Sequence, residues 1–374
     1  MAQAKVVDAL IVAVPETAGS ALYGMVDVLA ATGTLWRQLV GEEPCPSLIR
    51  PRIVSPSPEP FRCGNGIPVA PEVSIHEDPG APVVILPELW LAPTNPVQEL
   101  RIASLHVVVW RQPELGQDDD MQGRYPELLD WVRRRHRIGS TIYSACSGSV
   151  LLAATGLLNG RRATSHWGYE DLFRRRFPDV QFRPDPNLVF ADRTGRIVTA
   201  GGTTSWHDLA IHIISRHCSP GEALRIAKVY LLKWHSEGQL PYASLVRRQP
   251  HADAAVRCAE EWLACNFRTP QAVGAVVEVC GLPERTLKRR FKAATGSSLM
   301  SYVQNLRIEE AKRLLETGST PLEDIAAEAG YENAAFFRRL FRRCTGLTPG
   351  EYRRMFAPVA SAAAMPLGLE AVGS

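Results

Sequence analysis

The sequence lacks the features that define several protein classes. No apolar run approaches the roughly 18 residues that a membrane-spanning helix requires. The 8 cysteines are scattered without paired spacing, which is typical of a reducing compartment and not of a disulfide framework. Neither H-x-x-H nor C-x-x-C occurs, so we expect no metal and no cofactor. These absences favour a cytoplasmic protein without a membrane partner.

The net charge and the length of the chain exclude few protein classes. The 42 Lys and Arg residues nearly balance the 39 Asp and Glu residues, and the net charge is +3. The position of the cationic side chains therefore matters more than their number. The apolar run Val6–Val14 is preceded only by Lys5 and no cleavage site follows it, so it is predicted to be a buried strand and not a signal peptide. A chain of 374 residues indicates two domains and leaves room for a third.

Residues 1–235 are predicted to form an α/β domain. Short runs rich in β-branched residues alternate with amphipathic stretches of helical spacing. Continuous apolar strands between helices are typical of a parallel sheet covered on both faces, so we expect a doubly wound, mostly parallel sheet of flavodoxin-like type. The predicted strands are Val6–Val14, Pro51–Ser55, Pro82–Leu86, His106–Trp110, Thr141–Ala145 and Arg196–Gly202, and the predicted helices are Leu22–Thr32, Pro126–His136, Val150–Leu158 and His207–His217.

The pattern changes after this domain. Residues 236–255 lack periodicity and contain Gly238, Pro241 and Pro250, so they are predicted to be a linker. Residues 256–356 contain no strand-like run and are expected to form an all-α domain. The tail 357–374 is rich in Ala, Gly and Pro and is expected to be disordered.

The all-α domain repeats one helical pattern. In Ala272–Gly296, Gly281 provides a tight turn between two short helices, and in Pro321–Arg354 Gly330 does the same. The second helix of each copy has an apolar stripe with a Phe and several cationic side chains, and a long helix, about Ser301–Glu316, joins the copies. One such helix would be explained equally well as a solvated face. Two copies favour helix-turn-helix units that read the DNA major groove.

The stretch "IAAEAGYENAAFFRRLFRRCTGLTPGEYR" closely resembles the AraC/XylS-type DNA-binding domain, and the resemblance extends over roughly Val256–Phe356. It implies that the second helix of each unit is a recognition helix for promoter DNA. Where relatives commonly carry polar residues, this chain has Ala334 and Ala335, so the second unit is expected to contribute more affinity than specificity. Glu284 is expected to cap its helix and not to accept from cytosine. The residues expected to bind DNA are Arg285, Thr286, Lys288, Arg289, Arg338 and Arg339.

A second feature of interest lies in the α/β domain, where the strand Thr141–Ala145 is followed by Cys146 and a helix. Many hydrolases keep their nucleophile at such a strand-to-helix turn, and a helix N-terminus lowers the pKa of a thiol. The turn alone favours an inert role, because cysteine is also a common small buried residue. His166 lies downstream, in "TSHW", and a Cys–His pair could form a thiolate nucleophile.

The stretches "SACSGSVLLAATGLLNGRRATSHW" and "RIVTAGGTTSWHDLAIHII" resemble the class I glutamine-amidotransferase-like, PfpI-type superfamily, over about Val6–Ser215, and within it the GlxA-like regulators that are fused to AraC-type domains. The enzymes of the superfamily usually carry a glutamate on the helix after the first strand, where this chain has Ser20–Leu22. Many relatives also carry histidine where this chain has Ser147. Cys146 and His166 are therefore expected to be vestigial, and no enzyme activity is expected.

The strand-exit loops are expected to line a pocket for a small-molecule effector. Relatives of this type often respond to amino acids, betaines or similar nitrogen compounds, so the resemblance implies an effector of that kind. Trp167 and Trp206 could form an aromatic wall for a quaternary ammonium group, or they could pack in the core. The residues expected to bind the effector are Glu16, Cys146, Ser147, His166, Trp167, Thr203 and Trp206.

These features together predict a transcriptional regulator. Effector binding would shift the geometry of the DNA-binding domains. A homodimer is expected because one monomer reads only one half-site, and RNA polymerase is left open as a further partner. Two alternatives remain, a PfpI-like cysteine hydrolase or glyoxalase that uses Cys146 and His166, and a redox sensor in which Cys146 is oxidised to a sulfenic acid.

Overall fold

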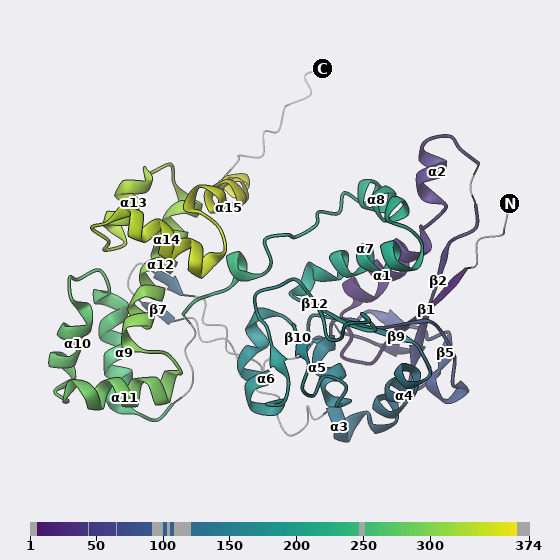
Figure 1. The fold of residues 1–374 in the computed structure, drawn as a ribbon, viewed down its shortest axis with the longest axis horizontal. Coiled ribbons are helices and arrows are strands. Elements are labelled where there is room, and N and C mark those ends of the chain that lie inside the picture. The colour runs from purple at the N-terminus through teal and green to yellow at the C-terminus, as the bar shows by residue number, and fades with distance from the viewer. Residues whose placement is uncertain are drawn as a thin grey trace, which may run out of the picture. The chain divides into compact units, whose positions relative to one another are not determined.

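The computed structural model describes residues 6–43, 45–64, 66–91, 100–102, 105–107, 121–246 and 251–364. The chain falls into an N-terminal unit, residues 1–96 and 112–239, and a C-terminal unit, residues 97–111 and 240–374. Figure 1 shows a sheet with helices on both of its faces in the first unit and the helices α9–α15 in the second.

The N-terminal unit is built on a seven-stranded sheet. Its order is β12-β13-β9-β6-β1-β2-β5, and only the pair β12–β13 is antiparallel. The predicted doubly wound, mostly parallel sheet is therefore confirmed. The strands are β1 (Val7–Val12), β2 (Ile49–Ser55), β5 (Val73–Ser74), β6 (Val83–Leu86), β9 (Thr141–Ala145), β12 (Leu188–Phe190) and β13 (Ile197–Ala200).

One predicted strand does not belong to this sheet. β8 (Leu105–Val107), the described start of the run "HVVVW", pairs antiparallel with β7 (Leu100–Ile102) in a separate two-stranded sheet. The prediction that this run joins the main sheet is wrong for 105–107, and 108–110 lie outside the described residues. A run of β-branched residues favours a strand but does not specify its partner. Further short pairs are β3 (Phe61–Arg62) with β4 (Pro68–Val69) and β10 (Arg162–Ala163) with β11 (Gln181–Phe182).

Successive residues of β1 enter two different cores, because side chains alternate between the faces of a strand. Leu10 packs with Trp131 and Phe173 on one face. Ile11 packs with Met25 on the other. The helices that cover the two faces are α1 (Gly19–Ala30), α2 (Leu35–Leu39), α3 (Met121–Arg124), α4 (Pro126–Arg137), α5 (Gly148–Ala154), α6 (Glu170–Arg176), α7 (Trp206–His217) and α8 (Pro220–Val229).

The C-terminal unit contains two helix-turn-helix units, each with its own core. Gly281 and Gly330 make the two turns with φ of +61° and +84°, a conformation that strongly favours glycine. Leu306 packs in the first core and Ile308 in the second, so one long helix serves both. The helices are α9 (Ala254–Asn266), α10 (Ala272–Cys280), α11 (Glu284–Thr295), α12 (Leu299–Thr317), α13 (Leu322–Glu328), α14 (Ala334–Thr345) and α15 (Pro349–Ala364).

The segments around this unit are more ordered than expected. The boundary between the units falls after Gln239, and residues 240–246, within the predicted linker, include the 3₁₀ helix η5 (Leu240–Tyr242). α15 continues to Ala364, so the stretch 357–364, which was expected to be disordered, is helical. Its several alanines favour helix, which a composition argument for disorder overlooks.

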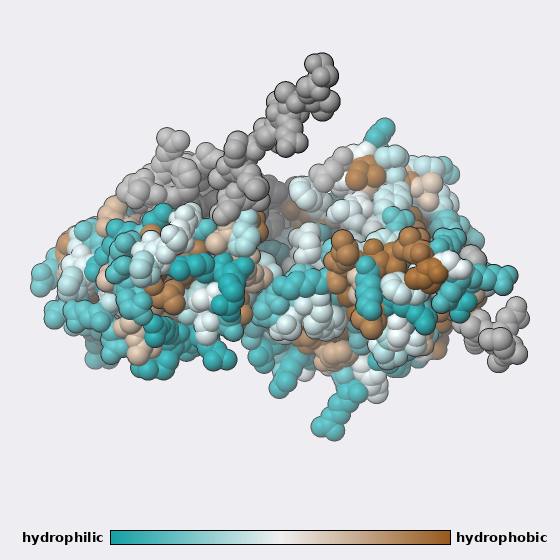
Figure 2. All heavy atoms as spheres, turned by 90° about the horizontal axis from the view of Figure 1, so that it is seen from above, coloured by the Kyte–Doolittle hydropathy of each residue, from teal (hydrophilic) through white to brown (hydrophobic). Residues whose placement is uncertain are grey.

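Apolar side chains also appear on the surface of the N-terminal unit (Figure 2). Leu224 of α8 and Leu231 just after it are 57% and 89% exposed, and Leu39 at the end of α2 is 66% exposed. α2 and α8 contact one another, so these side chains lie on neighbouring elements. Among the described residues, no helix combines the length and apolar character of a membrane span, and no group of three or more His, Cys, Asp or Glu is placed to hold a metal.

Candidate functional site

The turn after β9 holds Cys146 in a strained backbone conformation. Its φ is +51°, which is uncommon for a residue other than glycine, and its amide donates to the Ala200 carbonyl at 3.1 Å. At Gly148, a Cβ atom would lie 2.3 Å from the carbonyl oxygen of Leu86. The start of α5 thus packs directly on the loop after β6. This geometry is the nucleophile elbow that the sequence predicts.

An acidic group lies beside the Cys146 thiol, but it comes from an unexpected loop. The thiol donates to Oε1 of Glu88 at 3.6 Å, and Thr203 Oγ1 donates to the same oxygen at 3.1 Å. Glu88 is the second residue after β6, which pairs with β9 in the sheet. From the sequence, the positions considered for an acid were the helix after the first strand and Glu16 in the preceding loop, and Glu88 was not predicted. Its position in the exit loop of a predicted strand was the available signal.

The surroundings of this pair favour its neutral form. Cys146 is 2% exposed, and burial, together with the nearby Glu88, raises the pKa of its thiol. Burial also raises the pKa of Glu88, against hydrogen bonds from Thr203 and Cys146 that lower it. Within the described residues, Glu88 Oε2 is buried and accepts no hydrogen bond. Burial and the neighbouring Cys146 likewise raise the pKa of Tyr169. A thiol in this setting is not activated, because the nucleophile is the thiolate.

Ser147 and Glu16, both predicted to bind an effector, instead connect neighbouring loops of the protein. The Ser147 hydroxyl donates to the Leu89 carbonyl at 2.6 Å and accepts from the Leu89 amide at 2.8 Å, and the residue is fully buried. Glu16 accepts from the Tyr125 hydroxyl at 2.6 Å and pairs with Arg124. Ser147 therefore fixes the elbow to the loop after β6, and Glu16 fixes the loop after β1 to the start of α4.

The predicted aromatic residues have different environments. His166 Nδ1 accepts from the Gly168 amide at 3.0 Å, and the His166 ring lies 4.9 Å from that of Trp167, centroid to centroid. Trp206 packs against α1, where a Cβ on Gly24 would meet its ring at 2.5 Å. Core packing, the alternative for both tryptophans, therefore accounts for Trp206. Thr203 is exposed and contacts Glu88, so among the predicted residues the structure brings Cys146 and Thr203 together through Glu88.

A cavity of about 220 Å³ lies in the N-terminal unit. None of the residues predicted to bind an effector lines it. Its walls come from α3, α5 and the segment after α6, and include Gln122, Asn159 and Arg176. This cavity is therefore distinct from the elbow.

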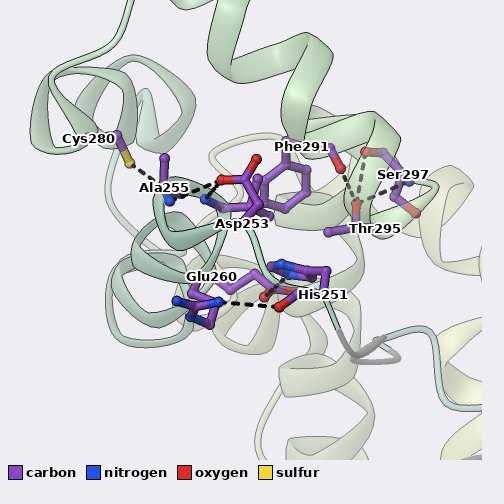
Figure 3. A network of polar contacts seen from close by, with 10 residues as sticks. His251, Asp253, Ala255, Glu260, Cys280, Phe291, Thr295 and Ser297 are labelled. Atoms are coloured by element: carbon purple, nitrogen blue, oxygen red, sulfur yellow. Dashed lines mark hydrogen bonds and ion pairs between the residues drawn. The ribbon is translucent and has the colours of Figure 1, made fainter.

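The first recognition helix, α11, has both paired and unpaired cations. Arg290 donates to Asp253, the N-cap residue of α9, at 2.6 and 2.8 Å. Figure 3 shows the Asp253 carboxylate bound to the Ala255 amide at the start of α9. Lys288 pairs with Glu284 one turn earlier, in the first turn of the helix. Arg285 and Arg289 are exposed, and their side chains make no hydrogen bond or ion pair within the described part of the chain. Thr286 lies on the same helix and is partly buried.

The second recognition helix, α14, has fewer cations at its start. Asn333 caps it by accepting from the Phe336 amide at 2.9 Å, and Ala334 is its first residue. Arg338 pairs with Glu323, whereas Arg339 is exposed and has no such partner among the described residues. Phe336 is 42% exposed. The sequence pattern does not distinguish this residue from the fully buried Phe337 that follows it.

Comparisons with known proteins match both units. The family model for the DJ-1/PfpI family matches residues 116–216, and the model for a helix-turn-helix domain matches residues 276–355. The HTH-type transcriptional regulator CdhR of Pseudomonas aeruginosa is 27% identical over 66% of this chain and 72% of its own. The HTH-type transcriptional regulator GlxA of Rhizobium meliloti is 28% identical over 60% of this chain and 68% of its own.

Among solved structures, a THiJ/PfpI family protein from Pseudomonas syringae aligns with a TM-score of 0.45 and 18% identity, over 74% of this chain and 92% of the other. The assignment rests on the family models and on the two regulators, which bear out the resemblance of both halves. The chain is a DNA-binding transcriptional regulator of the AraC/GlxA type, in which a DJ-1/PfpI-family domain precedes a helix-turn-helix domain.

Proposed function

We propose that the N-terminal unit senses a small molecule and that its binding alters how the C-terminal unit binds promoter DNA. The observation that carries this proposal is the elbow. Its fold and strained turn are those of a catalytic site, but the Cys146 thiol is buried beside Glu88 with a raised pKa. A site that keeps its shape without an activated nucleophile suits ligand binding better than catalysis.

The exposed cations of the recognition helices support the DNA-binding side. Arg285 and Arg289 on α11, and Arg339 on α14, project from helices that follow the turn glycines. A guanidinium group without an intramolecular partner is available for phosphates or for guanine edges. We include Thr286, Lys288 and Arg338 in the proposed DNA-binding set. Lys288 and Arg338 would first release the carboxylates with which they pair in the free protein.

The proposed effector is an amino acid, a betaine or a related nitrogen compound, for which the resemblance to GlxA-like regulators is the support. The proposed binding residues are those around the elbow, Cys146, His166, Trp167 and Thr203, to which we add Glu88. The proposed assembly is a cytoplasmic homodimer. The exposed apolar side chains on α2 and after α8 support it, since such surfaces mark protein contacts. RNA polymerase is a further proposed partner.

Two measurements test this function. Thermal unfolding of the full chain with a panel of amino acids and betaines identifies an effector, because a ligand that binds only the folded state raises the melting temperature. Gel shifts with the DNA upstream of its own gene, with and without that compound, then test regulation. The double variant R289A/R339A is the control for DNA binding. Absence of sequence-selective DNA binding by the wild type at every salt concentration contradicts the proposal.

The two alternative functions both require a reactive Cys146. A hydrolase or glyoxalase would lose turnover in Cys146→Ala, and a redox sensor would lose a peroxide-dependent change in DNA affinity in Cys146→Ser. The burial of the thiol and its raised pKa weigh against both. If Cys146→Ala leaves regulation and effector binding intact, neither alternative has a basis.

A further inference from the structure

The boundary between the two units falls between two adjacent residues, Gln239 and Leu240. Each of them belongs to a segment that is held within its own unit, as the contacts below show. We propose that residues 235–246, called the connector from here on, carry the effect of effector binding from the elbow to α12, with Gln239 as the positioning residue on the elbow side. This inference rests on the proposed sensing function of the elbow and names the route of its regulation.

Gln239 is held tightly in the N-terminal unit. It is 3% exposed, and its Nε2 lies within hydrogen-bond distance of Thr164 Oγ1 at 3.1 Å, the Ser165 carbonyl at 3.0 Å and the Pro186 carbonyl at 3.2 Å. Its Oε1 accepts from the Trp167 amide at 3.1 Å. One amide side chain therefore holds the loop that carries His166 and Trp167, the effector loop of the proposed function.

A single residue links Gln239 to the elbow itself. The Ser165 hydroxyl donates to the Cys146 carbonyl at 2.6 Å, and the Ser165 carbonyl accepts from Gln239. Gly201, just after β13, also touches the same side chain, because a Cβ at this position would lie 2.4 Å from Gln239 Cδ. A change at the elbow or in the effector loop therefore reaches Gln239 through direct contacts.

A second set of contacts holds the start of the connector. The amide and Nδ1 of His235 lie 2.9 and 2.8 Å from the two carboxylate oxygens of the buried Asp208. Asp208 also accepts from Asn187, which in turn accepts from the Ser205 hydroxyl. Ser205 belongs to the same 3₁₀ turn, η4 (Thr203–Ser205), as Thr203, the partner of Glu88. Both loops beside the elbow are thus tied to the connector.

The other half of the connector is held in the C-terminal unit by α12. The Ala243 carbonyl accepts from the buried Lys312 ammonium at 2.8 Å. The Leu245 amide donates to Glu309 Oε1 at 2.7 Å, and its carbonyl accepts from Asn305 Nδ2 at 3.0 Å. The side chain of Leu245 packs against the core of the second helix-turn-helix unit, and that of the next residue, Val246, against the core of the first.

The part of the connector between its two sets of hydrogen-bonded residues is short. Only Leu240, Pro241 and Tyr242 separate Gln239 from Ala243, a stretch that spans at most about 14 Å when fully extended. α12 contributes to both helix-turn-helix cores and therefore sets the spacing of α11 and α14. A displacement of Ala243 or Leu245 would move this helix, because both residues are hydrogen-bonded to it. A conformational change in the effector loop therefore biases the DNA-binding unit without a flexible linker to absorb it.

Hydrogen exchange of the full chain, followed by mass spectrometry, tests the coupling without effector or operator DNA. Gln239→Ala removes the bonds to the effector loop, and the Trp167 amide should exchange about three- to tenfold faster, the factor expected for one lost hydrogen bond. Lys312→Met, a change in the C-terminal unit, should raise exchange in the same peptide, residues 164–168, by about threefold. Lys292→Met, at an exposed lysine of α11, is the matched control and should leave it unchanged.

The inference is overturned if Lys312→Met raises exchange at residues 243–245 but leaves residues 164–168 unchanged. Gly201→Ala provides a second perturbation from the elbow side and should raise exchange at 243–245, whereas unchanged exchange there would contradict the coupling. Because this readout needs neither effector nor promoter, it is independent of the proposed function, whose failure would appear as loss of sequence-selective DNA binding by the wild type.

Discussion

The sulfur of Cys146 lies 3.6 Å from Oε1 of Glu88, which reaches the elbow from the loop after β6. Burial raises the pKa of both groups, and the neighbouring Glu88 raises that of the Cys146 thiol further, whereas the hydrogen bond from Cys146 lowers the pKa of Glu88. The Cys146 thiol therefore keeps its proton and donates it in a hydrogen bond to Glu88. This arrangement separates the elbow of this regulator from that of a cysteine enzyme, in which a basic partner draws the proton from the thiol.

The first prediction concerns the reactivity of the thiol. At neutral pH, iodoacetamide should alkylate Cys146 at least about tenfold more slowly than the exposed Cys265, because a thiol with a raised pKa is almost wholly protonated and this one is buried. The rate should rise only in strongly alkaline solution. Peptide mass spectrometry after timed labelling measures both sites in one sample. Equal rates at the two cysteines would restore the enzyme and redox alternatives.

A second prediction follows from the raised pKa of Glu88. An acid whose pKa is higher in the folded state than in the unfolded state favours folding at low pH, and this contribution is lost as the pH rises from the unfolded value through the folded one. Glu88→Gln has no such loss. The variant should therefore gain stability relative to the wild type from about pH 4.5 upward, by at most about 1.4 kcal/mol per pH unit.

Urea unfolding of the full chain at several pH values measures this difference, since its midpoint reports stability when the slope is unchanged. The Thr203→Val variant is a useful companion. It removes the hydrogen bond that lowers the pKa of Glu88, so the pH dependence should extend to higher pH. A constant offset between Glu88→Gln and the wild type at all pH values would show that Glu88 is not the titrating group.

Most of the fold was predictable from local patterns. The apolar runs that end at Val14, Leu86 and Ala145 identify central strands because a strand buried on both faces needs continuous apolar residues. The turns at Gly281 and Gly330 were predictable because few other residues adopt a positive φ readily. Edge strands such as β5 and β12 were not, since two or three residues carry no usable period.

The site was harder to predict because side-chain partners are set by tertiary contacts. Arg289 and Arg290 are adjacent and chemically identical, yet one is exposed and the other is bound to Asp253, 37 residues earlier. The sequence contains no signal for that difference. Glu88 was overlooked for the same reason, because its distance from Cys146 depends on the pairing of β6 with β9.

The third prediction concerns DNA binding. Arg289→Ala and Arg339→Ala should each weaken binding to a random-sequence duplex by about three- to tenfold, and lower the slope of log K against log salt by about one, because each removes one phosphate contact. Fluorescence anisotropy at about 50 to 200 mM KCl gives both quantities. Arg174→Ala, which removes a cation of the N-terminal unit that pairs with Glu170 and Asp171, is the matched control. An unchanged slope in both test variants would place the DNA elsewhere.

The last prediction concerns the cap that fixes α9 to α11. Asp253 accepts from the Ala255 and Val256 amides at 3.1 Å each and binds Arg290, and hydrogen bonds from these partners lower its pKa to about 2. An acid with a lowered pKa stabilises the fold above its unfolded value, so this contribution should disappear as the pH falls from about 4 to about 2.

Asp253→Ala removes both the cap and the ion pair and should lower the free energy of unfolding by about 1–2 kcal/mol at pH 7. Asp253→Asn keeps the capping oxygen, so its free energy of unfolding at pH 7 should fall by less than that of Asp253→Ala. Its stability should also depend less on pH between about 4 and about 2 than that of the wild type. Ser298→Ala, at the uncharged N-cap of α12 that accepts from the Ser301 amide at 3.1 Å, is the control. This variant should lower the free energy of unfolding by about 1 kcal/mol at every pH. If its stability depended less on acid pH than that of the wild type, Asp253 would not be the source of the stability lost at low pH.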